Sequence, residues 1–250
     1  MKYRHALITG ASSGFGHDLA MYFAEQGVHV FAAARGIERL ESLRAEAPAG
    51  MIEPWVIDVS DADATEARVR SLDADCGGLD LVIANAGIGE ETDGKQLHWS
   101  TVKQVIDINV LGATATLCGA IPGMVARGRG QLVGMSSIAA LKGLPRGSAY
   151  CASKSFLSTF LESLRFDLAP CGVVVTTIQP GFVKNEMTTK HWRRDVPFVV
   201  EQHDAVKRIV NAIVRGDSEL TFPWQLHMMM KMANLAPRAL VKAVVTRLRS

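Results

Sequence analysis

Short apolar strands alternate with amphipathic helices along this chain, and that alternation constrains the fold more than any other feature. The strands are mostly continuous apolar runs, which is typical of a parallel sheet covered on both faces. Alternating strands and helices predict right-handed crossovers and an α/β fold with a parallel sheet. We predict strands near residues 4–9, 28–34, 52–57, 79–84, 130–136, 172–178 and 218–222, and helices near 14–26, 36–47, 61–75, 99–127, 148–169 and 201–215.

A glycine-rich turn separates the first predicted strand from the first helix. Glycines let the backbone approach a pyrophosphate closely, and a helix N-terminus offers free N–H groups and a positive dipole end. The glycine spacing is Gly-x-x-x-Gly-x-Gly rather than the standard Gly-x-Gly-x-x-Gly, but the strand–turn–helix context favours a nucleotide site over a plain turn. We expect cofactor contacts from Gly10, Ser12, Ser13, Gly14, Phe15 and Gly16.

Other small or polar residues also follow predicted strands, namely Asp58, Asn85-Ala86-Gly87, Ser137 and Pro180-Gly181. The carboxyl ends of parallel strands meet at one edge of the sheet, where ligands of open α/β sheets bind. We therefore expect these residues to form one composite site.

Tyr150 and Lys154 stand four residues apart in a predicted helix. Side chains at this spacing share a helix face, so the phenol and the ammonium can reach one ligand. Lowering a phenol pKa from about 10 to about 7 takes roughly 4 kcal/mol. A neighbouring cation favours the phenolate, so we expect Lys154, with a cationic cofactor, to lower the pKa of Tyr150.

Together these segments resemble the single-domain short-chain dehydrogenase/reductase family. The residues that carry the resemblance are Thr9 to Gly16, Asn85-Ala86-Gly87, Asn109, Ser137, Tyr150-x-x-x-Lys154 and Pro180-Gly181. The resemblance covers about residues 4–222 and implies a doubly wound Rossmann fold, a seven-stranded sheet, a nicotinamide cofactor and carbonyl/alcohol chemistry. We predict a Rossmann dinucleotide-binding and catalytic domain over 1–222 and a C-terminal helical extension over 223–250.

The resemblance also implies catalytic roles. Ser137, which stands 13 residues before the tyrosine, would orient the substrate oxygen, with Ser136 as its rival. Tyr150 would exchange a proton with that oxygen, and Lys154 would hold the nicotinamide ribose. Asn109 would bind a water that links Lys154 to solvent, although an asparagine within a helix can equally be a packing residue.

The end of the second strand bears on the choice of cofactor. No acidic residue stands at positions 32–36 to bind both ribose hydroxyls of NAD. Arg35 can instead pair with the 2′-phosphate of NADP, and Ser13 can add a donor. The alternative is a solvated arginine at a helix start.

The remaining cofactor contacts follow from the resemblance. Asp58 and Val59 match its adenine-binding pair, although Asp58 can alternatively cap the next helix. The Asn85-Ala86-Gly87 turn would flank the adenine ribose. Pro180, Gly181 and Val183 would lie beside the nicotinamide.

The segment from Phe182 to Val200 is predicted to be a mobile lid. The family often has a threonine where Asn185 stands. Phe182, Met187 and Trp192 suggest an apolar substrate pocket, or alternatively packing beneath the lid.

Composition excludes several classes of function. The four cysteines show no paired spacing and the seven histidines no metal-ligand spacing, so we predict no disulfide framework and no metal site. The formal net charge is +2, without a basic motif or aromatic platform for nucleic acid. No apolar run approaches a membrane span of about 18 residues, and Met1 leads almost directly into the first strand, so we expect no signal peptide. We predict a cytoplasmic homo-oligomer, a dimer or tetramer.

The C-terminal extension is unusual in charge. No acidic residue follows Glu219, whereas Lys231, Arg238, Lys242, Arg247 and Arg249 give this stretch a charge of +5. Val241, Val244, Val245 and Leu248 form a helical stripe. The interpretations are helices packed on the protein or on a twin, a cap on the active site, or a basic amphipathic helix that touches a membrane.

These observations predict an NADP(H)-dependent oxidoreductase that interconverts a carbonyl and an alcohol, with Tyr150 as general acid/base. The alternatives are an NAD-dependent dehydrogenase of the same fold and a non-catalytic NADP-binding sensor or scaffold. The complete set of Asn109, Ser137, Tyr150 and Lys154 favours an enzyme, because a pure binder does not need it.

Overall fold

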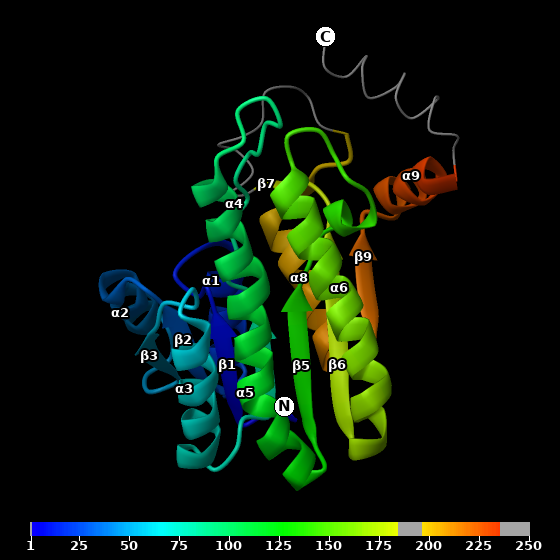
Figure 1. Ribbon diagram of the computed structural model, residues 1–250. Coiled ribbons are helices and arrows are strands. Elements are labelled where there is room, and N and C mark those ends of the chain that lie inside the picture. The colour runs from blue at the N-terminus through cyan, green and yellow to red at the C-terminus, as the bar shows by residue number, and fades with distance from the viewer. Residues whose placement is uncertain (1, 185–196, 236–250) are drawn as a thin grey trace.

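The computed structural model describes residues 2–184 and 197–235, and the predicted alternation of strands and helices runs through them (Figure 1). The strands are β1 (His5–Thr9), β2 (His29–Ala34), β3 (Ile52–Val56), β4 (Leu81–Ala84), β5 (Gly130–Met135), β6 (Val173–Pro180), β7 (Val183–Lys184), β8 (Val200–Glu201) and β9 (Glu219–Phe222). The helices are α1 (Gly14–Glu25), α2 (Ile37–Glu46), α3 (Ala62–Asp75), α4 (Trp99–Ile106), α5 (Ala113–Arg127), α6 (Ser148–Leu168), α8 (Gln202–Arg215) and α9 (Trp224–Leu235).

The main sheet has seven strands in the order β3-β2-β1-β4-β5-β6-β9, and every neighbouring pair is parallel. From β1 the chain builds outward through β2 and β3, then returns to place β4 on the other side of β1. This reversal is the switch point of a doubly wound fold, at which ligands bind beyond the carboxyl ends of the strands. The predicted seven-stranded Rossmann sheet is confirmed.

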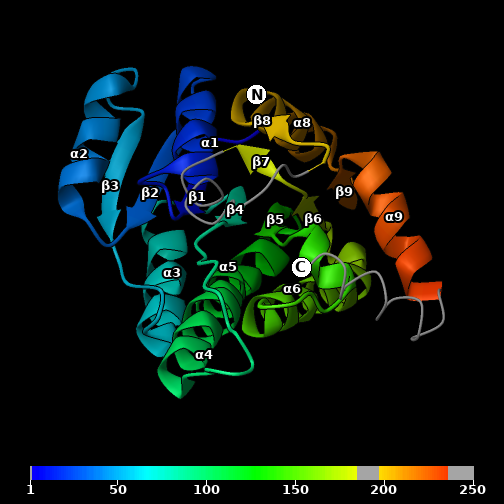
Figure 2. The same cartoon turned by 90° about the horizontal axis from the view of Figure 1, so that it is seen from above.

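Helices cover both faces of the sheet, as the view from above shows (Figure 2). One core joins the sheet to α1, α2 and α8, and the other joins it to α3, α5 and α6. The central strand β1 contributes side chains to both cores, because Ile8 lies in the first core and the adjacent Leu7 in the second. Both residues are fully buried, which explains why this strand is a continuous apolar run.

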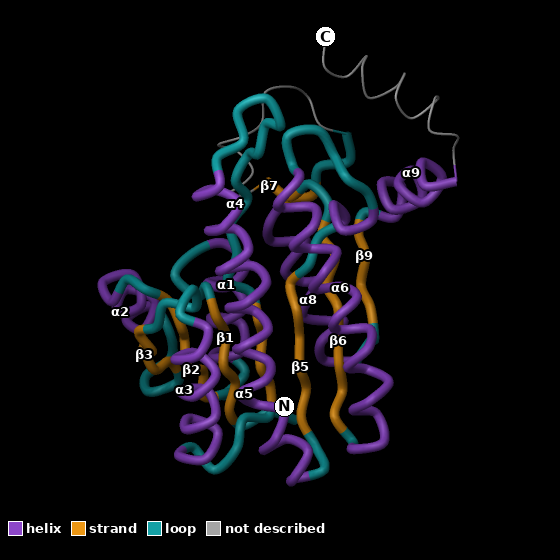
Figure 3. The backbone as a smooth tube through the Cα atoms, viewed as in Figure 1, coloured by secondary structure: helices purple, strands orange, loops and turns teal. Residues whose placement is uncertain are grey.

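The structure adds elements that the sequence pattern did not predict. The long predicted helix 99–127 is interrupted by a π-helical segment, Asp107–Gly112, between α4 and α5. The two-residue strands β7 and β8 pair with each other and flank residues 185–199. The tube view places the longest loops at the carboxyl edge of the sheet, above α4 and α6 (Figure 3).

One expectation about apolar segments was wrong. The helical stretch Trp99–Arg127 is long and apolar enough, by length and composition, to cross a membrane. More than half of its most apolar stretch is buried inside the protein, because the helix packs on the sheet and supplies Leu117 and Ala120 to the core. The core helix of a folded domain meets the same criteria.

Candidate functional site

A cavity of about 670 Å³ opens at the carboxyl ends of the strands, around the switch point. Its wall includes every cofactor-contact residue predicted from the sequence except Gly16, and it also includes Ser137. Asn109 does not line it. The lining residues not predicted as contacts are Ala33, Ala34, Gly36, Arg39, Ile57, Ile88, Ile108, Met135 and Ser136.

The glycine turn brings β1, β4 and α1 close together. Gly10 adopts a left-handed φ of 69°, and a Cβ on it would lie 2.9 Å from the Ala86 Cα. A Cβ on Gly16 would lie only 2.2 Å from the Gly10 carbonyl oxygen. Gly16 therefore lets α1 pack against the turn, while Gly10 and Gly14 line the cavity.

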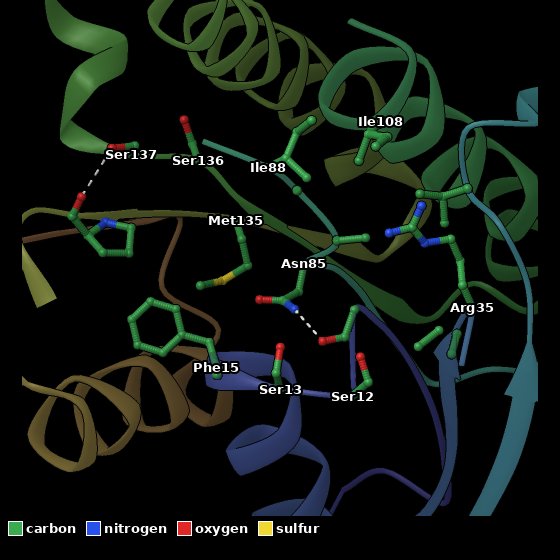
Figure 4. Close-up of a pocket in the computed structure, with 18 of the residues that line it drawn as sticks. Ser12, Ser13, Phe15, Arg35, Asn85, Ile88, Ile108, Met135, Ser136 and Ser137 are labelled. Carbon is green, nitrogen blue, oxygen red and sulfur yellow. Dashed lines mark hydrogen bonds between the residues drawn. The ribbon is translucent and has the colours of Figure 1, made fainter. Parts of the chain in front are cut away.

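Thr9 and Asn85 fix the floor of this turn. The Asn85 and Ala86 backbone N–H groups each donate to the Thr9 hydroxyl over 3.1 Å. The Asn85 amide donates to the Thr9 carbonyl over 2.9 Å. It also donates to the Gly10 carbonyl over 3.4 Å (Figure 4). This network holds the Asn85-Ala86-Gly87 turn against the glycine turn.

The N-terminus of α1 is open toward the cavity. Ser13 occupies the N-cap position, yet its hydroxyl makes no cap hydrogen bond. The first N–H groups of a helix lack partners within the helix. With Ser12, Ser13 and Gly14 in the wall, these groups can receive an anion such as a phosphate.

Two arginines lie at one end of the cavity. Arg35 follows β2, and Arg39 lies in α2. Arg39 was not predicted from the sequence, because Arg35 precedes the N-cap Gly36 and no helical spacing links the two arginines. Together they form a cationic end suited to a phosphate.

Asp58 lies in the same wall and does not cap α3. Its carboxylate accepts hydrogen bonds from the Ser60 N–H and hydroxyl, whereas Asp61 caps α3. Burial acts to raise the pKa of Asp58, but the bonds from Ser60 and the charge of Arg35 outweigh it and lower the pKa.

Tyr150 and Lys154 share a face of α6, as their spacing predicted. The Lys154 Nζ lies 5.7 Å from the centre of the Tyr150 ring and donates to the Met135 carbonyl over 2.7 Å. Burial lowers the pKa of Lys154 to about 8. The expectation that the pKa of Tyr150 is lowered was wrong for this structure, since burial of the phenol raises it and outweighs the opposing hydrogen bond with Ser137.

The structure separates the two neighbouring serines. Ser136 is held by α6, because its hydroxyl donates to the Lys154 carbonyl over 2.9 Å and contacts the Ser158 hydroxyl at 2.7 Å. Ser137 instead makes the hydrogen bond to Tyr150 and contacts the Pro180 carbonyl at 3.4 Å. Ser137 is thus the serine that meets the phenol.

Asn109 lies in the π-helical segment and is completely buried. Its amide donates to the Ile88 carbonyl over 2.9 Å and to the Ser153 hydroxyl over 3.1 Å, and its oxygen accepts from the Ile88 N–H over 2.8 Å. The side chain therefore fastens the loop after β4 to α6. Its predicted contact with a water stays a prediction.

The turn after β6 also lines the cavity. The Gly181 N–H donates to the Phe222 carbonyl over 2.7 Å, and Val183 begins the small β7–β8 sheet. The Val200 N–H donates to the Phe182 carbonyl, which ties the two ends of the predicted lid together. Asn185, Met187 and Trp192 lie outside the described residues, as does the stripe Val241, Val244, Val245 and Leu248.

Comparison with known proteins finds relatives along the chain. The family model described as short chain dehydrogenase matches residues 4–195. A Myxococcus xanthus protein described as an uncharacterized oxidoreductase is 53% identical over 251 residues, which cover 100% of this chain and 99% of that protein. The 3-oxoacyl-[acyl-carrier-protein] reductase FabG of Rickettsia conorii is 33% identical, covering 74% of this chain and 75% of that protein.

A solved structure matches the fold as well. It is a short-chain dehydrogenase from Sphingobium yanoikuyae in complex with NADPH, with a TM-score of 0.81 and 26% identity. The match covers 96% of this chain and 95% of that chain.

Proposed function

Because this chain belongs to the short-chain dehydrogenase/reductase family, we propose that it is an NADP(H)-dependent enzyme with Tyr150 as its general acid/base. The family makes it an oxidoreductase that acts on an alcohol or carbonyl group of a small-molecule substrate with NAD(P). The preference for NADP and the roles of single residues are the parts that we propose.

The cavity fits a nicotinamide dinucleotide. Ser12 and Ser13, at the glycine turn and the start of α1, lie between Arg35 and Ser137 (Figure 4). A Cβ on Gly87 would lie 3.2 Å from the Asn109 Oδ1 and 3.4 Å from the Lys154 Nζ, so a larger residue would intrude where a ribose must pass. We assign the pyrophosphate to the glycine turn and the adenine side to Asp58 and Val59.

Charge at the adenine end supports NADP. Arg35 and Arg39 line the cavity there, and no acidic side chain follows β2 at positions 35 or 36. A 2′-phosphate gains charge-assisted hydrogen bonds from guanidinium groups, whereas the ribose of NAD gains nothing comparable. The Sphingobium yanoikuyae relative, in complex with NADPH, agrees with this choice.

We assign the roles of the side chains from the family resemblance. Ser137 donates to the substrate oxygen and fixes it beside Tyr150. In reduction the Tyr150 hydroxyl gives its proton to that oxygen, and in oxidation the phenolate removes it. Lys154, buried next to the ring, holds the nicotinamide ribose. When bound, NADPH supplies the hydride.

One observation carries this proposal: Ser137, Tyr150 and Lys154, which come from two different elements, meet at one end of a cavity whose other end is cationic. The test is a panel of ketones and aldehydes incubated with NADPH or NADH, with the loss of reduced cofactor followed by absorbance. We expect turnover with NADPH to exceed turnover with NADH. Cofactor binding without turnover of any substrate would indicate the sensor or scaffold.

We also propose a partner for the C-terminal extension, residues 223–250, which continues the catalytic domain 1–222. In α9 the side chains of Trp224, Met228, Met229 and Met232 are at least half exposed, and Lys231 lies among them. The sequence beyond α9 adds four basic residues and no acidic one. An anionic membrane surface suits this combination, so we propose a cytoplasmic enzyme with peripheral membrane contact and an apolar substrate. The homo-oligomer stays a prediction.

A further inference from the structure

The helix that carries Tyr150, α6, begins without a side-chain cap from its own N-cap residue. Its N-cap residue, Gly147, has no side chain to accept a hydrogen bond from the first turn. Such a turn leaves N–H groups without partners within the helix, and they need an acceptor from elsewhere. This turn carries Tyr150, so its supports bear directly on the reaction.

Thr92, from the loop between β4 and α4, supplies the missing acceptor. The Ala149 N–H donates to the Thr92 hydroxyl over 3.2 Å, and the Ser148 hydroxyl donates to the same oxygen over 2.8 Å. Thr92 is only 3% exposed. Both lone pairs of its oxygen are used by the residues just before Tyr150.

The backbone around Thr92 is joined to the same turn. Thr92 forms an isolated parallel bridge with Gly147, and its N–H donates to the Arg146 carbonyl over 2.8 Å. Arg146 has a φ of 62°, a left-handed conformation that costs a non-glycine residue roughly 1–2 kcal/mol. Its guanidinium pairs with Glu91 at 2.6 Å, so the loop holds both the backbone and the side chain of this strained residue.

The same loop is fastened to α6 on the other side of Tyr150. Asn109 binds both backbone groups of Ile88 and also the Ser153 hydroxyl. The Ser153 hydroxyl donates to the Tyr150 carbonyl over 2.8 Å. Tyr150 is thus held from both sides by one loop, through Thr92 before it and through Ile88 and Asn109 after it.

We propose that Thr92 is a positioning residue for Tyr150, a helix cap supplied by a remote loop that sets the phenol against Ser137. The inference rests on the proposed function and adds a residue to it. Thr92 acts through Ser148 and Ala149 and does not line the cavity. A displacement of about 1 Å in a reacting group can cost up to a hundredfold in rate, so a cap at this position affects turnover more than binding.

The test compares Thr92→Val, which keeps the shape and removes the acceptor, with Thr92→Ser, which keeps the acceptor. We expect Thr92→Val to lower kcat on the order of tenfold while the Kd for NADPH stays unchanged, and Thr92→Ser to restore kcat. Thr176→Val is the matched control, because Thr176 is a buried threonine of β6 whose hydroxyl accepts from Gln131 at 3.0 Å. Equal kcat losses in Thr92→Val and Thr176→Val, or no rescue by serine, would overturn the proposal.

A second measurement needs no activity. The ultraviolet titration of Tyr150 is obtained by subtracting the signal of Tyr150→Phe, which also removes the contribution of the other two tyrosines. Ser137 from the end of β5, with Lys154 and Cys151 from α6, are the described groups that act on this phenol. Loss of the Ser137 hydrogen bond in Thr92→Val should raise the pKa of Tyr150, and an unchanged titration in a folded variant would contradict the proposal. If the wild type itself showed no turnover, the proposed function would fail while this titration still decided the role of Thr92.

Discussion

At the scale of one residue, Lys154 is a buried cation in the wall of the cavity. The residue is only 6% exposed, and its ammonium donates a hydrogen bond to the Met135 carbonyl. Burial lowers its pKa to about 8 from the usual 10.5. A cation held in such surroundings acts more strongly on a neighbouring phenol or ribose than it would in water.

This burial predicts a pH-dependent stability. Between about pH 8 and pH 10.5 the unfolded chain binds more protons than the folded protein. The free-energy cost of burying the charged Lys154 is therefore complete below pH 8 and decreases as the pH rises. Lys154→Met should stabilise the protein at pH 7 by about 2 kcal/mol, which is the relieved penalty less the lost bond to Met135. Urea unfolding at pH 7 and at pH 10 measures this difference. An advantage of the same size at both pH values would contradict the assignment.

A second prediction at this scale concerns Arg35 and Arg39. Arg35→Ala should weaken NADPH binding by roughly 1.5–3 kcal/mol, the range for hydrogen bonds to charged groups, and Arg39→Ala should weaken it by a smaller amount. NADH binding should barely change, because it has no 2′-phosphate. Fluorescence titration gives both affinities, with Arg44→Ala as the control on α2 outside this cavity. Equal losses for NADPH and NADH would show that these arginines are structural.

At the scale of the elements, the sequence predicted the main strands and helices because their apolar runs are local. It could not predict the π-helical segment, whose cause is tertiary: Asn109 is drawn to Ile88 and Ser153, which lie 21 and 44 residues away. The two-residue strands β7 and β8 are too short to show a periodicity. The capping role of Thr92 could not be predicted for a similar reason, because the helix that it caps begins about 56 residues further along the chain.

Gly16 gives a prediction for the packing of α1 on the glycine turn. In Gly16→Ala the new Cβ would meet the Gly10 carbonyl at 2.2 Å, and the backbone there must shift. We expect a loss of about 3 kcal/mol in unfolding free energy. Gly27→Ala is the control, because Gly27 has a φ of 78° but no atoms within 4 Å, and it should lose only about 1 kcal/mol. If chemical denaturation showed similar losses of unfolding free energy for Gly16→Ala and Gly27→Ala, the close-packing role of Gly16 would be refuted.

At the scale of the whole molecule, the doubly wound topology collects the site from segments that are distant in sequence. Alternating strands and helices were enough to predict that the loops after β1, β4, β5 and β6 share one edge. They were not enough to predict the pKa of Tyr150, because burial depends on the packed surroundings and not on the spacing of two residues.

The C-terminal extension is tested at the same scale. The full chain should sediment with vesicles of anionic lipid at low salt and detach at physiological salt, because salt screens the basic residues. Deletion of 236–250 should abolish sedimentation and leave the turnover of a water-soluble substrate intact. Failure of the full chain to sediment at low salt would eliminate the membrane contact, and a change in oligomeric mass on deletion would favour packing between copies.

The most direct test of the central claim is Tyr150→Phe, which removes one oxygen atom and keeps the ring. With Tyr22→Phe as the control, kcat for carbonyl reduction and the Kd for NADPH are measured under the same conditions. The account predicts that Tyr150→Phe binds NADPH like the wild type and loses turnover by at least two orders of magnitude, the lower end of what a general acid contributes. Turnover close to that of the wild type, in a variant that still binds NADPH, would contradict it.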